Sequence, residues 1–577
     1  MDALDVRSQL CLAGAVVVFS LLLLFRGKSD SALNNIPGPP SQSLWTGNLN
    51  QWLARDGAEF QRNVAFNYGP VAKIHGFLGV NDLGESGTAR VTDLCGYAIA
   101  ADSALQTILV KEEHVYQEMP AFFAHMNLLF GPGLLGTAGD KHRKQRKLLN
   151  PVFSIRHMRH MLPIFYGVVH KLRDAIAMRV SDGPAEIDFL HWMGRTALEL
   201  IGQGGLGYSF DKLVEDGDNE YGHAIKSLQP TLQRINILRR LLPYVHKLGP
   251  VWFRRLVMQY FPIKNVREAK MCVDTMHRCS TEIYKSKKIA LARGEEAVLK
   301  QVGEGKDIMS ILMKANMAAS AADRIPEEEL LAQMSTFISA ATDTTSNTLA
   351  RILEQLATHP ETQQKLREEI ITADAGETMA YDDLDSLPLL DAVCRETLRV
   401  FPPVTNLART PIQDAILPLS EPIVGVNGTV MHEIMVPKGT EIFIGVQGSN
   451  GSQARWGGDS YEWKPERWLS PLPKTVTGAP VPGVYSNLQV ALCMLDDVHG
   501  GKAGLHVRAD MNLSSGFKFS EMEMKIVLAV LLSNFTFELT AKPIEWNVSG
   551  VRYPTVGKES NVAQLPLKVG LYNNCKT

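Results

Sequence analysis

Apolar residues recur with a helical period along most of the chain up to about residue 400. Beyond that point, short apolar runs stand between Gly and Pro residues and resemble strands. The clearest helix begins at Pro326, whose three following glutamates make a favourable first turn, and its periodicity runs to Ala357, shortly before Pro360. The pattern predicts one mainly α body with a minor β region, and it contains no internal repeat or low-complexity linker.

The middle of this helix carries the segment Ala340-Ala341-Thr342-Asp343-Thr344-Thr345. Small residues and hydroxyls recur there at spacings of three and four, so one helix face fits a flat, bulky group. Asp343 and Thr344 are consecutive, and they can share a water or relay a proton at the edge of that group. The alternative is close packing on a neighbouring helix, with Thr hydroxyls bonded back to the preceding turn.

The N-terminal residues contain an uninterrupted run of apolar and small residues at positions 10–25, followed by Arg26 and Lys28. The run is slightly short for a bilayer core of about 27 to 30 Å. A signal peptide begins with a basic region, whereas this chain has Asp2 and Asp5 there. We therefore expect a retained membrane anchor over residues 1–28. The positive residues after the run place the rest of the chain in the cytosol.

A stiff Pro-rich linker is expected at residues 29–45, where the chain contains Ile36-Pro37-Gly38-Pro39-Pro40. Residues 46–577 are then expected to form a single domain. With 577 residues, 45% hydrophobic and 21% charged, the chain can bury the core of a large enzyme. A net charge of -2 gives no case for nucleic-acid binding, and seven scattered cysteines indicate a reducing compartment.

A second chemical group is the pair Glu396 and Arg399, which shares one face of a helix expected to end before Pro402. An exposed pair of this kind contributes little stability. The apolar residues around it favour a buried pair that needs further partners. Arg467, in the segment Pro465-Glu466-Arg467-Trp468, is the candidate partner.

Two further segments allow either a purely structural or a functional interpretation. Residues 140–147 are basic and suit a solvated helix. His142 and Arg146 nevertheless lie four residues apart on one helix face, so they can bind two carboxylates of a ligand. Residues 238–256 mix bulky apolar residues with arginines, so they form either a membrane-surface helix or an ordinary surface helix. Residues 202–207 match GxGxxG, but a helix rather than a strand precedes them, so we reject nicotinamide binding there.

Taken in order, these segments resemble the cytochrome P-450 family of haem-thiolate monooxygenases, especially the membrane-anchored eukaryotic type, from the anchor to about residue 539. The resemblance implies the cytochrome P-450 fold, a helical body around haem b with small β-sheets. Residues 340–345 match the small-small-x-acid-Thr motif, with Ala341 where glycine is usual. Glu396 and Arg399 match ExxR, and Arg467 falls in the PERF-like segment.

The resemblance also implies a role for each site residue. Asp343 and Thr344 would deliver protons to dioxygen at the haem iron, and Arg467 would join Glu396 and Arg399 in a structural triad. His142 stands where tryptophan is usual in a WxxxR motif. The expected haem contacts are His142, Arg146, Arg409, Ala340 and Ala341, and the expected substrate pocket contains Phe122, Phe123, Met126, Leu128, Phe130, Phe337, Val404 and Leu407.

The cysteine that should ligate the iron is where the chain departs from the family. The family has a loop of the form FxxGxRxCxG at this point, and residues 489–515 contain no such loop. Counting back from Gly516 puts the ligand at position 514, which is Ser514. Cys493 is the cysteine nearby and therefore the remaining candidate for the iron ligand. The alternative is an inert core cysteine, because Cys493 lies in an apolar run.

Two explanations remain open for this segment: a mis-spliced or wrongly predicted product of an intact gene, or a chain that has lost its ligand and serves as a haem-free binding protein. Family sequence resumes abruptly on both sides, which favours the first. The function expected from the resemblance is insertion of one oxygen atom from dioxygen into a hydrophobic small molecule. Electrons would come from NADPH through a separate membrane-bound cytochrome reductase, and the protein would sit in the endoplasmic reticulum membrane, facing the cytosol.

Overall fold

The computed structural model describes residues 32–43, 46–76, 96–99, 102–214, 220–235, 239, 242, 249–321, 323–478 and 516–572. The predicted anchor at residues 1–28 and the atypical segment at residues 489–515 lie outside the described residues. Within the described part, no helix combines the length and the apolar character that crossing a bilayer requires.

The chain forms two compact units. The first unit contains the residues up to 53 together with residues 59–117 and 408–445, and the second contains residues 54–58, 118–407 and those from 446 onward. The expected single domain over residues 46–577 stays a prediction.

The first unit is built on a five-stranded sheet with the strand order β1-β2-β8-β5-β3. β2 pairs with β8 in parallel, whereas β1 pairs with β2 and β3 with β5 in the antiparallel direction. A separate antiparallel pair joins β6 and β7. The strands are β1 (Val71–Ile74), β2 (Gly96–Ile99), β3 (Tyr116–Gln117), β5 (Asn406–Pro411), β6 (Ala415–Val424), β7 (Val430–Val436) and β8 (Glu441–Gly445).

Short helical segments accompany this sheet in the sequence. Trp52 and Phe443 are buried together with a small aliphatic set, and their ring centroids lie 5.8 Å apart. These apolar contacts give the unit its own core. The helical segments are η1 (Ala32–Asn35), α2 (Leu49–Trp52), α3 (Gly57–Tyr68), α4 (Asp102–Gln106) and η3 (Thr107–Lys111).

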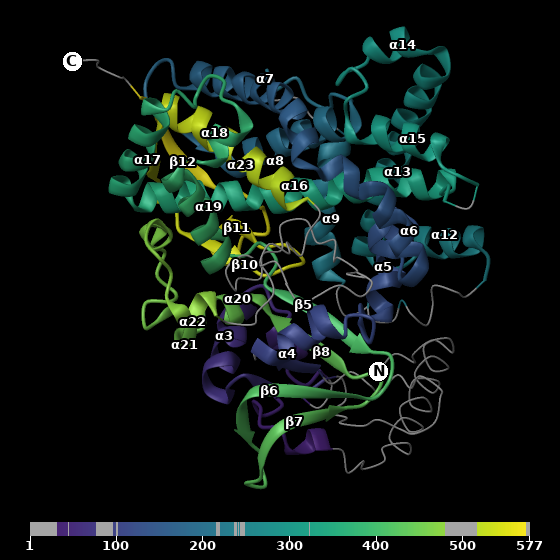
Figure 1. Ribbon diagram of the computed structural model, residues 1–577, viewed down its shortest axis with the longest axis vertical. Coiled ribbons are helices and arrows are strands. Elements are labelled where there is room, and N and C mark those ends of the chain that lie inside the picture. The colour runs from purple at the N-terminus through teal and green to yellow at the C-terminus, as the bar shows by residue number, and fades with distance from the viewer. Residues whose placement is uncertain are drawn as a thin grey trace, which may run out of the picture. The chain divides into compact units, whose positions relative to one another are not determined.

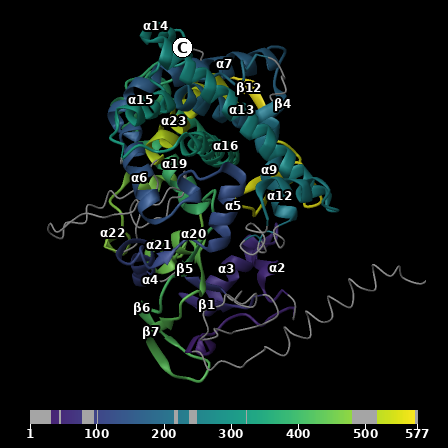
Figure 2. The same ribbon diagram turned by 90° about the vertical axis from the view of Figure 1, so that its right-hand side faces the viewer.

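The second unit is mainly helical and is organised around α16 (Glu327–Thr358). Figures 1 and 2 show α16 running through this unit, in contact with α8, α13, α17, α19 and α23. The principal helices are α5 (Pro120–Phe130), α6 (Gly139–Leu149), α7 (Ile155–Arg179), α8 (Phe189–Leu200), α9 (Glu220–Arg234), α12 (Val251–Gln259), α13 (Lys264–Arg293), α15 (Ile308–Ala318), α17 (Pro360–Thr372), α19 (Pro388–Val400) and α23 (Phe517–Asn534).

Shorter segments and two small sheets complete the unit. The sheets are antiparallel, with the orders β4-β12-β9 and β10-β11. These elements are η4 (Leu134–Gly136), η5 (Asn150–Phe153), β4 (Ala185–Asp188), η6 (Ile201–Leu206), α14 (Glu295–Leu299), α18 (Tyr381–Asp385), α20 (Val446–Asn450), α21 (Gln453–Trp456), η7 (Pro465–Leu469), α22 (Lys474–Thr477), β9 (Phe535–Leu539), β10 (Ile544–Asn547), β11 (Tyr553–Val556) and β12 (Pro566–Leu571). A mainly α chain with a minor β region is confirmed.

The two helices that carry the candidate chemistry have the boundaries that the sequence predicts. α16 is 32 residues long, with Pro326 as N-cap and acidic residues throughout its first turn. α19 ends at Val400, just before Pro402, because the residue preceding a proline is disfavoured in a helix.

The glycine-rich segment at residues 202–207 is a structural element rather than a nucleotide loop. Helix α8 leads directly into the π-helical turn η6, and Gly207 closes that turn in the left-handed region at φ 57°. A Cβ on Gly207 would lie 2.6 Å from Nζ of Lys287, which forms a buried ion pair of 2.9 Å with Asp307. The glycines therefore serve close packing, and the helix predicted before them is confirmed.

Candidate active site

The segment at residues 340–345 lies in the middle of α16, where the helix is otherwise buried. Between residues 332 and 350 every side chain is buried except those of Ser339, Ala340 and Asp343, which are partly exposed. Open space therefore adjoins the helix at Ala340, beside the small buried side chain of Ala341. A larger residue at Ala340 would narrow this partly exposed part of the helix, so the small side chain leaves room for a ligand.

The threonine hydroxyls of this segment have different partners. Thr344 Oγ1 donates to the carbonyl oxygen of Ala340 at 2.7 Å, and Thr348 donates in the same way to Thr344. These bonds to the preceding turn are the ones that the packing alternative predicts. Thr345 instead donates to the buried Glu523 of α23 at 3.4 Å. Because a hydroxyl has one proton and two lone pairs, Thr344 Oγ1 keeps the capacity to accept a proton.

The side chain of Asp343 is partly exposed and has an unusually high pKa. Burial raises the pKa of Asp343 to about 7, although the charge of Lys226 on α9 lowers it. The carboxyl group therefore keeps its proton to a higher pH than an ordinary aspartic acid does. Among the described residues, no hydrogen bond or ion pair engages its side chain. An acid of this kind both gives and takes protons near neutral pH, which suits a relay.

The small side chains of Ala340 and Ala341 are compatible with a flat haem ring beside α16, but the described residues do not supply a thiolate ligand for its iron. They include Cys272, Cys279 and Cys394, and burial raises the pKa of each of these thiols. A raised pKa opposes the thiolate that a haem ligand requires. Cys493 and Ser514 lie outside the described residues, so any cysteine ligand also lies outside them.

Glu396, Arg399 and Arg467 meet in one buried cluster. Arg399 holds both carboxylate oxygens of Glu396 at 2.8 Å, and Arg467 Nε donates to the same carboxylate at 2.9 Å. Arg399 Nη1 also donates to the carbonyl oxygens of Asn450 and Ser460, at 3.0 and 2.6 Å. The cluster ties α19 to the loops that follow β8.

Sequence reasoning missed two further donors to Glu396. The indole N–H of Trp468 donates at 2.9 Å, and the backbone N–H of Lys464 donates at 3.0 Å. Trp463 donates to Thr397 at 2.9 Å in the next turn of α19. The role of Trp468 could have been predicted from the sequence, because tryptophans flank Arg467 and a buried indole N–H needs a hydrogen-bond acceptor.

The basic segment at residues 140–147 forms α6, which carries His142 and Arg146 four residues apart. Arg146 is buried and His142 is partly exposed. Part of the basic charge is neutralised, because Lys141 pairs with Glu329 of α16 at 3.0 Å. Arg409, the third expected basic haem contact, is buried in the other compact unit, where it donates to the Ala408 carbonyl oxygen at 2.6 Å.

The expected pocket residues separate into three groups. Phe122, Phe123, Met126 and Val404 are partly exposed, whereas Phe130 and Leu407 are buried. Phe337 packs on Phe153 in the hydrophobic core, with ring centroids 5.9 Å apart. The place of Leu128 in the pocket stays a prediction, and its side chain is 45% exposed on the surface of α5. The reason is the helical period, which turns Leu128 away from the buried Phe130 and Ala124.

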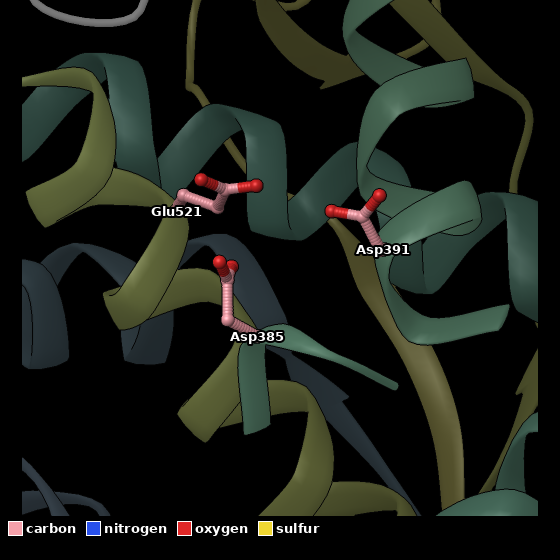
Figure 3. A group of neighbouring side chains, drawn as sticks. All are labelled: Asp385, Asp391 and Glu521. Atoms are coloured by element: carbon pink, nitrogen blue, oxygen red, sulfur yellow. The ribbon is translucent and has the colours of Figure 1, made fainter. Parts of the chain in front are cut away.

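Three carboxylates outside this site approach one another. Figure 3 shows Asp385, Asp391 and Glu521, which come from α18, α19 and α23. The Lys525 ammonium lies 2.7, 2.9 and 3.3 Å from them in that order, and its side chain is 1% exposed. The lysine already supplies the positive charge that a metal ion would bring, so the cluster is an ion-pair network that joins three helices.

Comparison with known proteins agrees with this geometry. The family model described as Cytochrome P450 matches residues 97–476. The chain is 74% identical to "Cytochrome P450 monooxygenase 81" of Postia placenta over 99% of both chains. It is 44% identical to "Ganoderic acid synthetase CYP5150L8" of Ganoderma lucidum over 97% of both chains. The chain therefore belongs to the cytochrome P450 family of monooxygenase enzymes.

Proposed function

We propose that this chain is a haem-dependent monooxygenase that inserts one oxygen atom from dioxygen into a hydrophobic small molecule. Electrons come from NADPH through a separate cytochrome reductase, because the sequence contains no flavin or nicotinamide module. The observation that carries the proposal is the pair Asp343 and Thr344 on α16, beside the open space at Ala340.

When bound, the haem supplies the one-electron and dioxygen chemistry that side chains lack. Ala340 and Ala341 leave room for its ring, and Arg146 would hold a propionate. The chain's own relay moves protons: the Asp343 carboxylic acid gives its proton to Thr344 Oγ1, and Thr344 releases its hydroxyl proton toward the reaction. The apolar surroundings of α16 exclude bulk water, so the proton reaches the reacting group.

A hydrophobic substrate is favoured by the side chains expected around it. Phe122, Phe123 and Met126 on α5 are apolar and partly exposed, which suits contact with a ligand. A relative at 44% identity is named a ganoderic acid synthetase, which supports a small-molecule substrate for this chain as well.

The proposal also includes a single-pass protein of the endoplasmic reticulum membrane whose catalytic part faces the cytosol. The apolar run at residues 10–25 supports it, as does α12, on which Trp252 is 68% exposed beside the exposed Arg255. Tyr260, just after α12, is 74% exposed. Exposed aromatic rings with basic neighbours suit an anionic bilayer surface. Exposed basic residues of α6, such as Lys147, would steer the reductase.

The alternative function is a catalytically inactive, haem-deficient binding protein, or a mis-spliced product without the thiolate ligand. The specific observation in its favour is Ser514 at the expected ligand position. A hydroxyl stays protonated near neutral pH and binds iron weakly. Transcripts sequenced across residues 487–516 decide whether a form with the FxxGxRxC loop exists.

One spectrum separates the two functions. The full chain is expressed, supplied with haem, reduced and exposed to carbon monoxide. A thiolate-type Soret band supports the monooxygenase, and its absence from a folded chain supports the binding protein. Cys493→Ser then tests the ligand, because survival of the thiolate band in this variant excludes Cys493.

A further inference from the structure

A cavity of about 670 Å³ lies within the helical unit. Its walls come from α8, α9, α13 and α16, together with the loops on both sides of β11. The volume is within the range of small-molecule sites in proteins. The function proposed above does not assign a ligand to this cavity.

The cavity meets α16 on the side away from the proposed haem face. Its lining residues on this helix are Thr342, Asp343, Ser346 and Asn347. The proposed haem face carries Ala340, Ala341, Thr344 and Thr345. A helix turns by about 100° per residue, which directs the two sets to opposite sides of α16. A molecule in the cavity therefore occupies a different site from the haem.

Lys226 brings a positive charge into the cavity by crossing α8 at Gly194. A Cβ on Gly194 would lie 2.7 Å from Cε of Lys226 and 3.2 Å from its Nζ. Glycine inside a helix is destabilising relative to alanine. Here the missing side chain makes room for the lysine stem, so the local sequence of α8 fixes the path of Lys226.

Two polar groups of the cavity have hydrogen-bonding capacity that the fold does not use. Lys226 Nζ lies 3.3 Å from the carbonyl oxygen of His191 and 3.4 Å from its Nδ1, and no ion pair engages it among the described residues. The buried hydroxyl of Thr342 has no hydrogen-bond partner in the described part of the chain. An ammonium has three donors and a hydroxyl has one, so both groups can serve acceptor oxygens of a ligand.

The acids that line the cavity oppose this positive charge only weakly. Asp188 accepts bonds from three backbone N–H groups, and Glu268 pairs with Lys264 at 3.3 Å. Burial raises the pKa of Asp343 to about 7, so this acid carries less negative charge at neutral pH than an ordinary aspartate. Arg234 also lines the cavity, is exposed, and forms no ion pair with the described residues. The charge that remains available in the cavity is therefore positive and suits an anion.

Apolar side chains line the same cavity. Leu190 and Tyr553 are buried there, whereas Met271 and Val562 are 67% and 63% exposed. Exposed apolar side chains at a cavity gain free energy when an apolar ligand covers them. The cavity thus combines an ammonium that lacks a counterion with an apolar wall, which is what an amphipathic anion requires.

We propose that this cavity is a second ligand site, which binds a carboxylic acid with an apolar body. The carboxylate lies on Lys226, and the apolar body lies along Met271 and Val562. One ammonium neutralises one negative charge, which favours a monocarboxylate over a doubly charged phosphate. The ligand binds reversibly, and the site goes beyond the proposed monooxygenase function because it needs no bound haem.

Two cysteines of α13 make the site measurable in the full chain. Cys272 and Cys279 are both partly exposed, and Cys272 lines the cavity whereas Cys279 is not among its lining residues. Trypsin cuts after Lys270, Arg278 and Lys285, so mass spectrometry reads the two thiols in separate peptides. The rate at which N-ethylmaleimide alkylates each thiol reports its access to solvent.

The probe is dodecanoate below its micelle-forming concentration, and dodecan-1-ol is the uncharged probe with the same chain length. Saturating dodecanoate should slow the alkylation of Cys272 at least about fivefold, because the bound chain covers the thiol, and leave that of Cys279 unchanged. Dodecan-1-ol should need an at least about tenfold higher concentration for the same protection, because it lacks the charge that pairs with Lys226.

Variants test the role of the lysine. In Lys226→Met, the dodecanoate concentration that half-protects Cys272 should rise at least about tenfold, because a charge-assisted hydrogen bond is lost. Gly194→Ala should weaken protection in the same direction, because the new Cβ displaces the lysine. Lys226→Arg should keep the preference for dodecanoate over dodecan-1-ol. Lys300→Met, a change at an exposed lysine that pairs with Glu296, should leave protection unchanged.

Four results overturn the proposal: no protection of Cys272, equal protection of Cys279, equal protection by dodecan-1-ol, or an unchanged half-protecting concentration in Lys226→Met. The alkylation rate of Cys279 without probe shows whether each variant is folded. Where Lys226→Met does not fold, the comparison of the two probes in the parent chain and in Lys226→Arg decides. The measurement needs neither haem nor carbon monoxide, so its result is independent of the spectrum that tests the monooxygenase.

Discussion

Arg399 and Glu396 form a two-point ion pair within a single helix, and both side chains are 0% exposed. The guanidinium Nε and Nη2 lie 2.8 Å from the two carboxylate oxygens. Further donors from Arg467, Lys464 and Trp468 reach the same carboxylate. A buried charge with all of its partners present is stable as a group, and removing one partner leaves an uncompensated charge.

Arg399→Met should therefore lower the free energy of unfolding by about 3 to 5 kcal/mol, because it leaves the Glu396 carboxylate without its principal partner. Urea unfolding followed by circular dichroism measures the change. The control is Lys300→Met, which removes an exposed lysine paired with Glu296 and should leave the unfolding midpoint unchanged within error. Equal midpoints for the two variants contradict the prediction.

Lys525→Met should destabilise the chain most at high pH. The substitution removes the buried cation that Asp385, Asp391 and Glu521 share. It leaves only the less buried cations Lys518, beside Asp385 and Glu521, and Arg395, beside Asp391. The mutual repulsion of the three carboxylates destabilises the folded state most when all of them are ionised. Protonation at acidic pH relieves this repulsion, so the loss of stability is larger at higher pH.

Thermal unfolding of Lys525→Met at pH 5 and pH 8 measures this effect, and the deficit relative to the parent chain should be larger at pH 8. Lys518→Met is the matched control, because Lys518 pairs with Glu521 at 2.8 Å but is more exposed. A deficit that is the same at both pH values would show that packing, rather than charge, explains the loss.

Glu523→Gln should stabilise the chain at pH 8 and leave it unchanged near pH 4. Burial raises the pKa of Glu523 well above 4.5, so the folded state favours the protonated acid. The raised pKa makes a contribution to stability that is present below the unfolded pKa and lost as the pH rises toward the folded one. Glutamine keeps a hydrogen-bond acceptor for Thr345 and cannot ionise. Thermal midpoints from pH 4 to pH 8 test this, with the exposed Glu538→Gln as control.

Gly207→Ala should cost more stability than Gly557→Ala, although both glycines have positive φ angles, of 57° and 71°. Alanine at Gly557 has nothing within 4 Å of its Cβ, so it adds backbone strain of about 1 kcal/mol. Alanine at Gly207 adds the same strain and also presses on the buried Lys287–Asp307 pair. Urea unfolding of both variants gives the difference, and equal losses would refute the packing role of Gly207.

Much of the fold could be predicted from local pattern. The start of α16 at Pro326 and its acidic first turn follow from capping and the helix dipole, which act between neighbouring residues. The pairing of Glu396 with Arg399 follows from their spacing on one helix face. Arg467 was predicted as a partner from its segment Pro465-Glu466-Arg467-Trp468, but its hydrogen bond to Glu396 bridges 71 residues and depends on the loops after β8.

The sequence did not predict which residues surround Asp343. The pair Asp343 and Thr344 indicated a relay, but Lys226 acts on Asp343 from α9 across Gly194, and neither spacing nor composition links these positions. Likewise, the resemblance to the family placed Leu128 with the pocket residues, and only the packing of α5 shows that its side chain is 45% exposed.

By itself, the sequence determined the helices, the order of the motifs and the family to which the chain belongs, because helix propensity, capping and residue spacing operate over a few positions along the chain. Only the tertiary structure decided which side chains share a buried environment. That decision sets the acidity of Asp343, the partners of Glu396 and the ion pairs of Lys525, because burial and the charges of distant segments control the energy of an ionised group.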